Sequence, residues 1–268
     1  MPRSHAVWHY GLMAEYWALF KQASPELPGL LALLQRSGQP VLDLCCGTGR
    51  VLLGLLRAGL DTDGVDVSAD MISHANAAAA REGYSPHLSV QPMGTFSARR
   101  SYGTIVIVDS FGLGGNRSLD RTTLRRCRAA LKPGGALIMN IQAEYASSEA
   151  WALWSKDGRR RLPEHWPEPP IERVAPNGDV YRLRIRCLAS SPISQSYERE
   201  MRIEKWVNGA RVGVESATLA GNMYLPSEVT AILREAGFDD VELLSGFTGL
   251  PATDDSSEVV FFARAGSE

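Results

Sequence analysis

The sequence predicts an α/β fold in which a mostly parallel sheet has helices on both faces and carries an inserted antiparallel lobe. Three observations predict it. Short apolar strands alternate with helical segments over residues 40–142, the order that builds a parallel sheet. Longer alternating runs then span residues 180–219, with an Asn-Gly hairpin signal at 208–209. Helix and strand patterns return over residues 226–263.

The main sheet is expected to have seven strands. Their apolar, β-branched segments are residues 41–44, 64–67, 88–90, 104–108, 136–141, 241–244 and 259–263. Helices are predicted between them, because Gly59 and Gly83 are suitable C-terminal stops and Ser68 is a suitable N-cap. Further helices are predicted over about 119–131 and 226–236.

The remaining segments flank or interrupt this sheet. Residues 8–20 are rich in aromatic side chains, which predicts a helix docked on the rest of the protein. We therefore expect a helical lid at 1–37, a sheet domain at 38–145 and 222–268, and an inserted antiparallel lobe at 146–221 that covers the substrate.

Composition limits the classes of function. The formal net charge of −2 provides no basic surface for a phosphate backbone, so nucleic acid is not an expected partner. No apolar run reaches the roughly 18 residues that cross a bilayer, and the N-terminus lacks a signal-peptide core. The four cysteines have no metal-ligand spacing, and two are adjacent. We expect a cytoplasmic protein without a metal or a membrane partner; a homodimer stays open.

A glycine turn joins the first strand to the first helix of the sheet. It comprises residues 43–49, Asp-Leu-Cys-Cys-Gly-Thr-Gly, at the carboxyl edge of the sheet, where such folds bind ligands. Asp66 ends the second strand, near the spacing at which an acid receives ribose hydroxyls. Strand, turn and acid together predict a nucleoside site.

Two residues decide which nucleoside is bound. A dinucleotide fingerprint has a third glycine where Leu52 stands. Asp43, beside the turn, would repel a pyrophosphate but attract a ligand that carries an ammonium and a sulfonium. The charge at Asp43 therefore favours S-adenosylmethionine over NAD.

Six segments resemble the successive motifs of class I S-adenosylmethionine-dependent methyltransferases. They are VLDLCCGTGR, GVDVSADM, YGTIVIVDSFG and LKPGGALIMNI within residues 38–142, and LPSEVTAILREAGFDDVEL and VVFFARA near the C-terminus. The resemblance implies a Rossmann-like seven-stranded sheet. With its aromatic lid and antiparallel lobe, the chain is most similar to bacterial small-molecule enzymes, such as the antibiotic-pathway sugar N-methyltransferases and glycine N-methyltransferase.

The resemblance also implies site residues. It places the methionine end of the cofactor on the glycine turn, the ribose on Asp66 and the adenine between apolar side chains. Asp109 and Ser110, after the fourth strand, are expected to face the transferred methyl as catalytic residues. Together with Asp43, which is inferred from its charge, the expected cofactor contacts are Tyr16, Cys45, Cys46, Gly47, Gly49, Asp66, Val67, Met71, Met93 and Asp109.

Two positions depart from the family pattern. Cys45 stands where the family usually has glycine, and we expect the turn to survive if the φ angle of Cys45 is negative. Pro92 stands where an acid often contacts the adenine amino group, so backbone groups and Met93 are expected to hold the adenine instead. A thiol role for Cys45 or Cys46 is rejected, because small buried cysteines are usually packing residues.

The lobe strands each have a charged face. Three arginines on one strand and three glutamates on the next are expected to form a solvated, cross-strand-paired face rather than an anion site: Arg182, Arg184, Arg186, Glu198, Glu200 and Glu204. The opposite face should cover the core or the acceptor. It carries Tyr181, Leu183, Ile185, Met201 and Ile203.

The predicted function is transfer of a methyl group to a small molecule in a biosynthetic pathway. A hydroxyl acceptor needs a base, and among five histidines only His9, on the lid, and His165 are placed to reach the acceptor. Neither lies in a fixing motif, so N-methylation driven by proximity is favoured, with O-methylation as runner-up and His9 as the candidate base. A non-catalytic S-adenosylmethionine-binding protein and a nicotinamide oxidoreductase are the alternatives.

Overall fold

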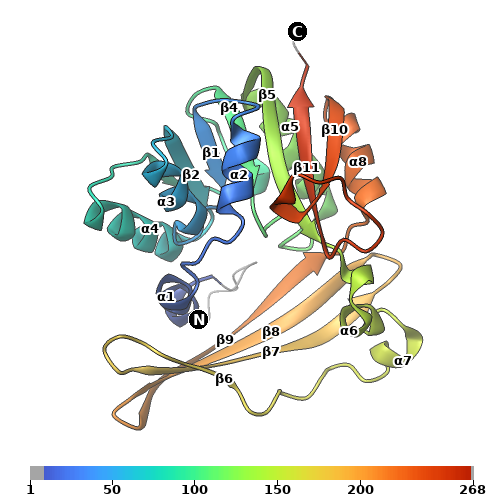
Figure 1. Ribbon diagram of the computed structural model, residues 1–268. Coiled ribbons are helices and arrows are strands. Elements are labelled where there is room, and N and C mark those ends of the chain that lie inside the picture. The colour runs from blue at the N-terminus through green and yellow to red at the C-terminus, as the bar shows by residue number, and fades with distance from the viewer. Residues whose placement is uncertain (1–8, 267–268) are drawn as a thin grey trace.

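A computed structural model of the protein describes residues 9–266. A seven-stranded sheet has the strand order β10-β11-β5-β4-β1-β2-β3 (Figure 1). Its strands are β1 (Val41–Leu44), β2 (Thr62–Asp66), β3 (Leu88–Val90), β4 (Tyr102–Ile107), β5 (Leu131–Gln142), β10 (Phe238–Ser245) and β11 (Glu258–Ala265). Strands β1 to β5 pair in parallel, whereas β11 is antiparallel to both β5 and β10. The predicted mostly parallel α/β sheet is confirmed.

Eight α-helices accompany the strands in the described part of the chain. They are α1 (Gly11–Phe20), α2 (Leu27–Leu34), α3 (Arg50–Arg57), α4 (Ala69–Arg81), α5 (Arg117–Ala130), α6 (Ser148–Ala152), α7 (Lys156–Arg159) and α8 (Pro226–Glu235). Three short 3₁₀ segments are η1 (Met93–Thr95), η2 (Glu144–Ala146) and η3 (Gly246–Thr248). Within residues 9–266, every helix is too short or too polar to cross a bilayer.

The two faces of the main sheet bury separate apolar clusters. Alternate residues of β5 divide between them: Met139 packs with α5 and α8, whereas Ile138 packs with α2 and α3. In β11, Phe261 and Phe262 divide in the same way. Successive side chains of a strand point to opposite faces, so a sheet covered by helices on both sides needs continuous apolar runs. This explains why these strands read as unbroken hydrophobic segments.

The second sheet is antiparallel and has the order β6-β7-β8-β9. Its strands are β6 (Ile171–Val174), β7 (Val180–Ser191), β8 (Ser196–Val207) and β9 (Ala210–Asn222). Figure 1 shows this sheet lying beneath the open edge of the main sheet, with α1 above one end and α6 and α7 at the other. Strand β6 was not predicted, because only four residues of the proline-rich passage form it.

The inner face of the lobe packs against α1. Met13 and Tyr16 of the helix lie in one buried cluster with Tyr181, Met201 and other lobe residues. The Tyr181 hydroxyl also donates a hydrogen bond of 2.6 Å to the Glu15 carboxylate. The prediction of a buried inner face is thus correct for four of the five residues named for it. Ile185 is the exception.

Ile185 lies on the predicted face of β7 but remains 36% exposed. It is not part of the apolar cluster formed with α1, which includes the neighbouring Leu183. Strand alternation predicts which face a side chain occupies but not how far the covering helix extends along that face.

The outer face of the lobe carries ion pairs, with one difference from expectation. Arg186 pairs across β7 and β8 with Glu200 at 2.7 Å, as predicted for this face. Arg182 instead pairs with Glu172 of β6 at 2.8 Å, and Arg184 with Glu168 at 2.8 Å. The cause is the unpredicted strand β6 and the segment before it, because Glu172 lies on β6 and Glu168 precedes it.

A buried polar cluster joins the lobe to the main domain. Asp120 of α5 is 2% exposed and accepts hydrogen bonds of 2.8 Å from both Asn222, at the end of β9, and the Tyr224 hydroxyl. Nearby, the Gly114 N–H donates to the Ala220 carbonyl at 2.8 Å. The loop after β4 is therefore tied to the end of the lobe.

We predict that Tyr224→Phe destabilises the protein by about 1.5–3 kcal/mol, the usual contribution of a hydrogen bond to a charged group. The substitution leaves the buried Asp120 carboxylate with one donor fewer. Urea unfolding measures the change. Tyr84→Phe is the control, since no hydrogen bond from the Tyr84 hydroxyl occurs among the described residues, and it should change stability by under about 0.5 kcal/mol. Equal losses in both variants would contradict the assignment.

Candidate cofactor and acceptor cavity

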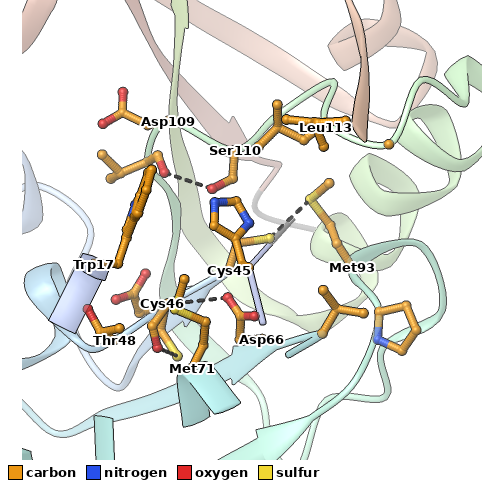
Figure 2. A pocket seen from close by; sticks show the side chains of 18 of the residues that line it. Trp17, Cys45, Cys46, Thr48, Asp66, Met71, Met93, Asp109, Ser110 and Leu113 are labelled. Carbon is orange, nitrogen blue, oxygen red and sulfur yellow. Dashed lines mark hydrogen bonds between the residues drawn. The ribbon is translucent and has the colours of Figure 1, made fainter. Parts of the chain in front are cut away.

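A cavity of about 640 Å³ lies at the carboxyl ends of the central strands. Its walls come from the glycine turn after β1, the ends of β2 and β4, the start of α5, the α1 segment and the inner face of the lobe. At this edge the chain leaves neighbouring strands for helices on opposite faces of the sheet. Backbone polar groups of the connecting turns are therefore accessible to a ligand. Figure 2 shows the side chains that surround this cavity.

The glycine turn has three residues in the left-handed region: Cys45 (φ 71°), Gly47 (φ 54°) and Gly49 (φ 90°). A Cβ atom at Gly47 would meet nothing within 4 Å, so the backbone there faces open space. At Gly49, the N-cap residue of α3, a Cβ atom would lie 3.4 Å from the side chain of Ala75. Gly49 does not line the cavity and instead permits close packing of α3 and α4.

The positive φ angle of Cys45 contradicts the condition under which the turn was expected to survive. A non-glycine residue in this conformation costs about 1–3 kcal/mol and persists only where the surroundings impose it. The N–H groups of Cys45 and Cys46 both donate to the Val65 carbonyl, at 2.7 and 3.0 Å. These bonds to β2 hold the turn in place.

Asp66 binds the turn with its side chain. Its carboxylate accepts hydrogen bonds of 2.9 Å from the N–H groups of Gly47 and Ser68. Burial raises the pKa of Asp66, while these backbone donors oppose the rise. A carboxylate has about four acceptor positions, so two remain for hydroxyl groups in the cavity.

Asp43 is buried below the turn without full compensation. It is 2% exposed, and its Oδ2 atom has no hydrogen-bond partner. Burial raises the pKa of Asp43 to about 7, although the Arg50 charge and the Leu52 N–H act to lower it. Buried polar groups nearly always have partners, so a carboxylate oxygen without one, on a residue that lines a cavity, indicates a nearby position for a cationic group.

A further part of the cavity wall is apolar and rich in sulfur. Val67, Met71 and Met93 all line the cavity, and the Cys45 sulfur lies 3.6 Å from the Met93 sulfur (Figure 2). Such polarizable side chains suit the flat face of a heteroaromatic ring. Burial raises the pKa of the Cys45 thiol well above its usual range, which supports a packing role.

Asp109 and Ser110 take different orientations. The Asp109 carboxylate accepts hydrogen bonds from Asn140 at 2.7 Å and from Arg50 at 3.1 Å, and half of its side chain is exposed. Ser110 donates to the Val108 carbonyl at 3.0 Å. In Figure 2 the Ser110 side chain points toward Cys45, whereas the Asp109 side chain points away. Both residues line the cavity, but only the Ser110 side chain is turned toward the glycine turn, and their expected catalytic role stays a prediction.

The α1 segment brings His9 to the cavity, as expected, but Trp17 in place of the expected Tyr16. Tyr16 lies in the lobe cluster and does not line the cavity, whereas Trp17 does. His9 also lines the cavity, with its ring edge-to-face with Trp17 at 5.5 Å. Burial lowers the pKa of His9 to about 4. His165 is exposed and lies outside the cavity.

Several lining residues were missed by sequence reasoning. They are Trp17, Lys21, Thr48, Arg50, Tyr197, Arg199 and Leu219. A signal existed for two of them. Arg199 and Tyr197 have the same strand parity as Met201 and Ile203, which were predicted for the inner face of the lobe. All of the residues expected to contact cofactor line the cavity except Tyr16 and Gly49.

Comparisons with known proteins show what this chain is similar to. A methyltransferase-domain family model matches residues 41–135, from the start of β1 into the first part of β5. A relative from Geobacillus sp. (strain WCH70), whose name marks it as a candidate methyltransferase, is 28% identical over 97% of this chain and 98% of its own length.

Solved structures share the whole fold. An S-adenosylmethionine-dependent methyltransferase from Clostridium acetobutylicum ATCC 824 aligns with a TM-score of 0.72 at 15% identity, covering 95% of this chain and 98% of that one. The sugar N-methyltransferase KedS8 from Streptoalloteichus sp ATCC 53650 aligns with a TM-score of 0.67 at 16% identity, covering 99% and 98%. Residues 41–135 therefore match a methyltransferase domain, and the fold of the chain is similar to that of solved S-adenosylmethionine-dependent methyltransferases.

Proposed function

We propose that the protein transfers a methyl group from S-adenosylmethionine to a nitrogen atom of a small molecule. The observation that carries this proposal is Asp43, a buried residue that lines the cavity beside the glycine turn and whose Oδ2 atom has no hydrogen-bond partner. A buried carboxylate oxygen without a donor gains most from a ligand with positive charge, and S-adenosylmethionine has an ammonium and a sulfonium.

The other residues of this half fit the remaining parts of the cofactor. The open backbone at Gly47 gives room for the methionine portion. The two free acceptor positions of Asp66 suit the ribose hydroxyls. Val67, Met71 and Met93 form an apolar slot for the adenine.

A nicotinamide oxidoreductase fits less well. Leu52 is fully buried at the position where a dinucleotide fold has its third glycine. The pyrophosphate would also meet the Asp43 and Asp66 carboxylates at the turn. A protein that binds S-adenosylmethionine without turnover is the alternative from another class, and transfer of labelled methyl to an acceptor distinguishes it.

The main contributions of the chain are to position the two reactants and to exclude water from the cavity. S-adenosylmethionine supplies a methyl on a sulfonium: as the new N–C bond forms, the C–S bond breaks with its electron pair to sulfur, and the amine loses a proton to solvent. Trp17 and the inner face of the lobe cover the cavity on the side away from the sheet. Holding the two reactants at contact distance supplies a large part of the barrier reduction.

The state of His9 supports nitrogen rather than oxygen as the acceptor. With a pKa of about 4, His9 is neutral at pH 7 but holds a proton weakly, whereas an efficient general base has a pKa near the working pH. A neutral amine needs no such base. The structural similarity to a sugar N-methyltransferase points the same way.

We predict that S-adenosylmethionine and its demethylated product bind and that NAD does not. Asp66→Asn should weaken binding about 10- to 150-fold, corresponding to about 1.5–3 kcal/mol for hydrogen bonds to a charged group. Isothermal calorimetry measures both. Asp239→Asn, an exposed carboxylate on β10, is the matched control and should bind as the unmodified protein does. Tighter binding of NAD than of S-adenosylmethionine would overturn the proposal.

We predict that cofactor binding releases a proton from Asp43 near neutral pH. The pKa of Asp43 is about 7 in the free protein against 3.8 ordinarily, and a bound cation favours the ionised form. The dissociation constant should therefore rise as pH falls from about 7 toward 5, by up to about tenfold per unit, and level off above 7. Calorimetry in two buffers of different ionisation enthalpy counts the proton.

Asp43→Asn is the control for this pH dependence. The cofactor's amino group titrates equally in both proteins, so the difference between them isolates Asp43. A slope that persists unchanged in Asp43→Asn would show that another group releases the proton.

We predict that His9→Gln lowers turnover by less than about tenfold while cofactor binding stays intact. Proximity rather than base catalysis is proposed, and a general base contributes about 10²- to 10⁴-fold. Turnover is measured as formation of demethylated cofactor with an amine acceptor. A loss of about 100-fold or more, with unchanged cofactor affinity, would favour a hydroxyl acceptor.

A further inference from the structure

The lobe contributes two polar side chains to the cavity. Tyr197 and Arg199 stand on the inner face of β8, separated by one residue, and both line the cavity together with Leu219 of β9. Residues two apart on a strand point to the same side, so both side chains face the main domain. Nothing in the cofactor half of the cavity requires them.

Arg199 is positioned but only partly paired. Its guanidinium lies over the Tyr197 ring at 4.5 Å from the ring centre. One terminal nitrogen lies 3.5 Å from Glu144 Oε1, while the other Glu144 oxygen accepts a hydrogen bond of 2.6 Å from the Trp154 ring nitrogen. Among the described residues, this single long contact is the only hydrogen bond of the Arg199 guanidinium, so most of its five N–H donors remain available.

Tyr197 is held in a fixed position with its hydroxyl unpartnered. A Cβ atom at Gly221 on the neighbouring strand would lie 2.3 Å from the ring carbon that carries the hydroxyl, so the ring occupies the space that glycine leaves. The Trp154 ring packs edge-to-face against the Tyr197 ring, with 6.4 Å between the ring centroids. No hydrogen bond of this hydroxyl occurs within residues 9–266. A phenol and a guanidinium thus offer donors from one wall.

The other two cations of the cavity belong to the cofactor side. Arg50 pairs with Glu26 and with Asp109. Lys21 is followed directly by Gln22, whose amide lies 3.5 Å from the Thr48 hydroxyl in the glycine turn. The chain at residues 21–22 therefore lies beside the glycine turn, whereas Arg199 is the one cation that the lobe contributes to the cavity in the described part of the chain.

The charges of the cavity are also divided between its walls. The carboxylates that line it, Asp43, Asp66, Asp109 and Asp120, all come from the main domain. The lobe contributes Arg199 and no carboxylate. A ligand held between the walls is best matched with its positive or neutral part toward the sheet and its negative part toward the lobe.

We propose that the methyl acceptor carries an anionic group, a carboxylate or a phosphate, which Arg199 and Tyr197 bind. This inference rests on the proposed function and adds the class of acceptor: an amine directed toward the cofactor, with an anion at its other end. Guanidinium groups match both anions through paired N–H donors, and the Tyr197 hydroxyl can donate to the same group.

The test uses protein saturated with demethylated cofactor and three amines of similar length. They are 3-aminopropanol, which has no anion, 3-aminopropanoate, which has a carboxylate, and 2-aminoethyl phosphate. Calorimetry or ligand-observed NMR should show at least one anionic amine binding about tenfold or more tightly than the amino alcohol. The tighter of the two anions identifies which group the site accepts.

Variants assign the preference to these residues. Arg199→Gln should reduce binding of the anionic amine to the level of the amino alcohol, and Tyr197→Phe should weaken it by about 2- to 10-fold, as for loss of one hydrogen bond. Arg202→Gln is the matched control, because Arg202 lies on the same strand with its side chain on the opposite face, paired with Glu204. It should leave binding unchanged. Circular dichroism verifies that each variant is folded.

Two failures are separable. If demethylated cofactor does not bind, the proposed function fails before the acceptor is considered. If it binds, but neither anionic amine binds more tightly than the amino alcohol, or Arg199→Gln keeps the preference, the acceptor inference is overturned while the proposed function stands.

Discussion

The hydrogen bonds of the Asp66 carboxylate are the constraint on which the site depends. One oxygen accepts from Gly47 in the glycine turn and the other from Ser68, which begins α4. The two loops at the carboxyl edge of the sheet are thereby fixed relative to each other. The segment directly before α1 is bound at the same junction. The Ser68 hydroxyl donates to the His9 carbonyl, and the Tyr10 hydroxyl donates to the Val67 carbonyl at 3.2 Å. The glycine turn and the segment that leads into α1 therefore share one anchor.

Helix α1 links that anchor to the lobe. The first N–H groups of a helix lack partners within it and favour carboxylates. Gly11 N–H donates to Asp70 of α4 at 2.7 Å, and Leu12 N–H donates to Glu215 of β9 at 2.8 Å. One carboxylate comes from the main domain and one from the lobe, so the start of α1 joins both. The buried face of α1 packs with the lobe, which brings the inner face of β8 over the cavity.

The sequence was sufficient wherever structure is decided locally. The strand–helix alternation and the Ser68 cap depend on neighbours within a few residues. The same is true of the placement of Asp43 and Asp66 on their strands. The sheet predicted from these local patterns is observed. Predictions failed where a distant segment decides. The φ angle of Cys45 is imposed by the Val65 carbonyl, and Tyr16 is drawn into the lobe by Tyr181. No pattern within residues 8–20 distinguishes the side of α1 that meets the lobe from the side that meets the cavity.

The two halves of the cavity consequently have different origins. The half proposed for the cofactor is built from the short turns that end β1 and β2, which the main sheet holds on both sides. The acceptor half is built from alternate residues of β8 and β9, where the parity of a strand decides which side chains enter. Replacing Arg199 or Leu219 changes the acceptor wall without touching any hydrogen bond of the glycine turn. A fold assembled in this way can keep one cofactor while its lobe is adapted to acceptors of different charge and shape.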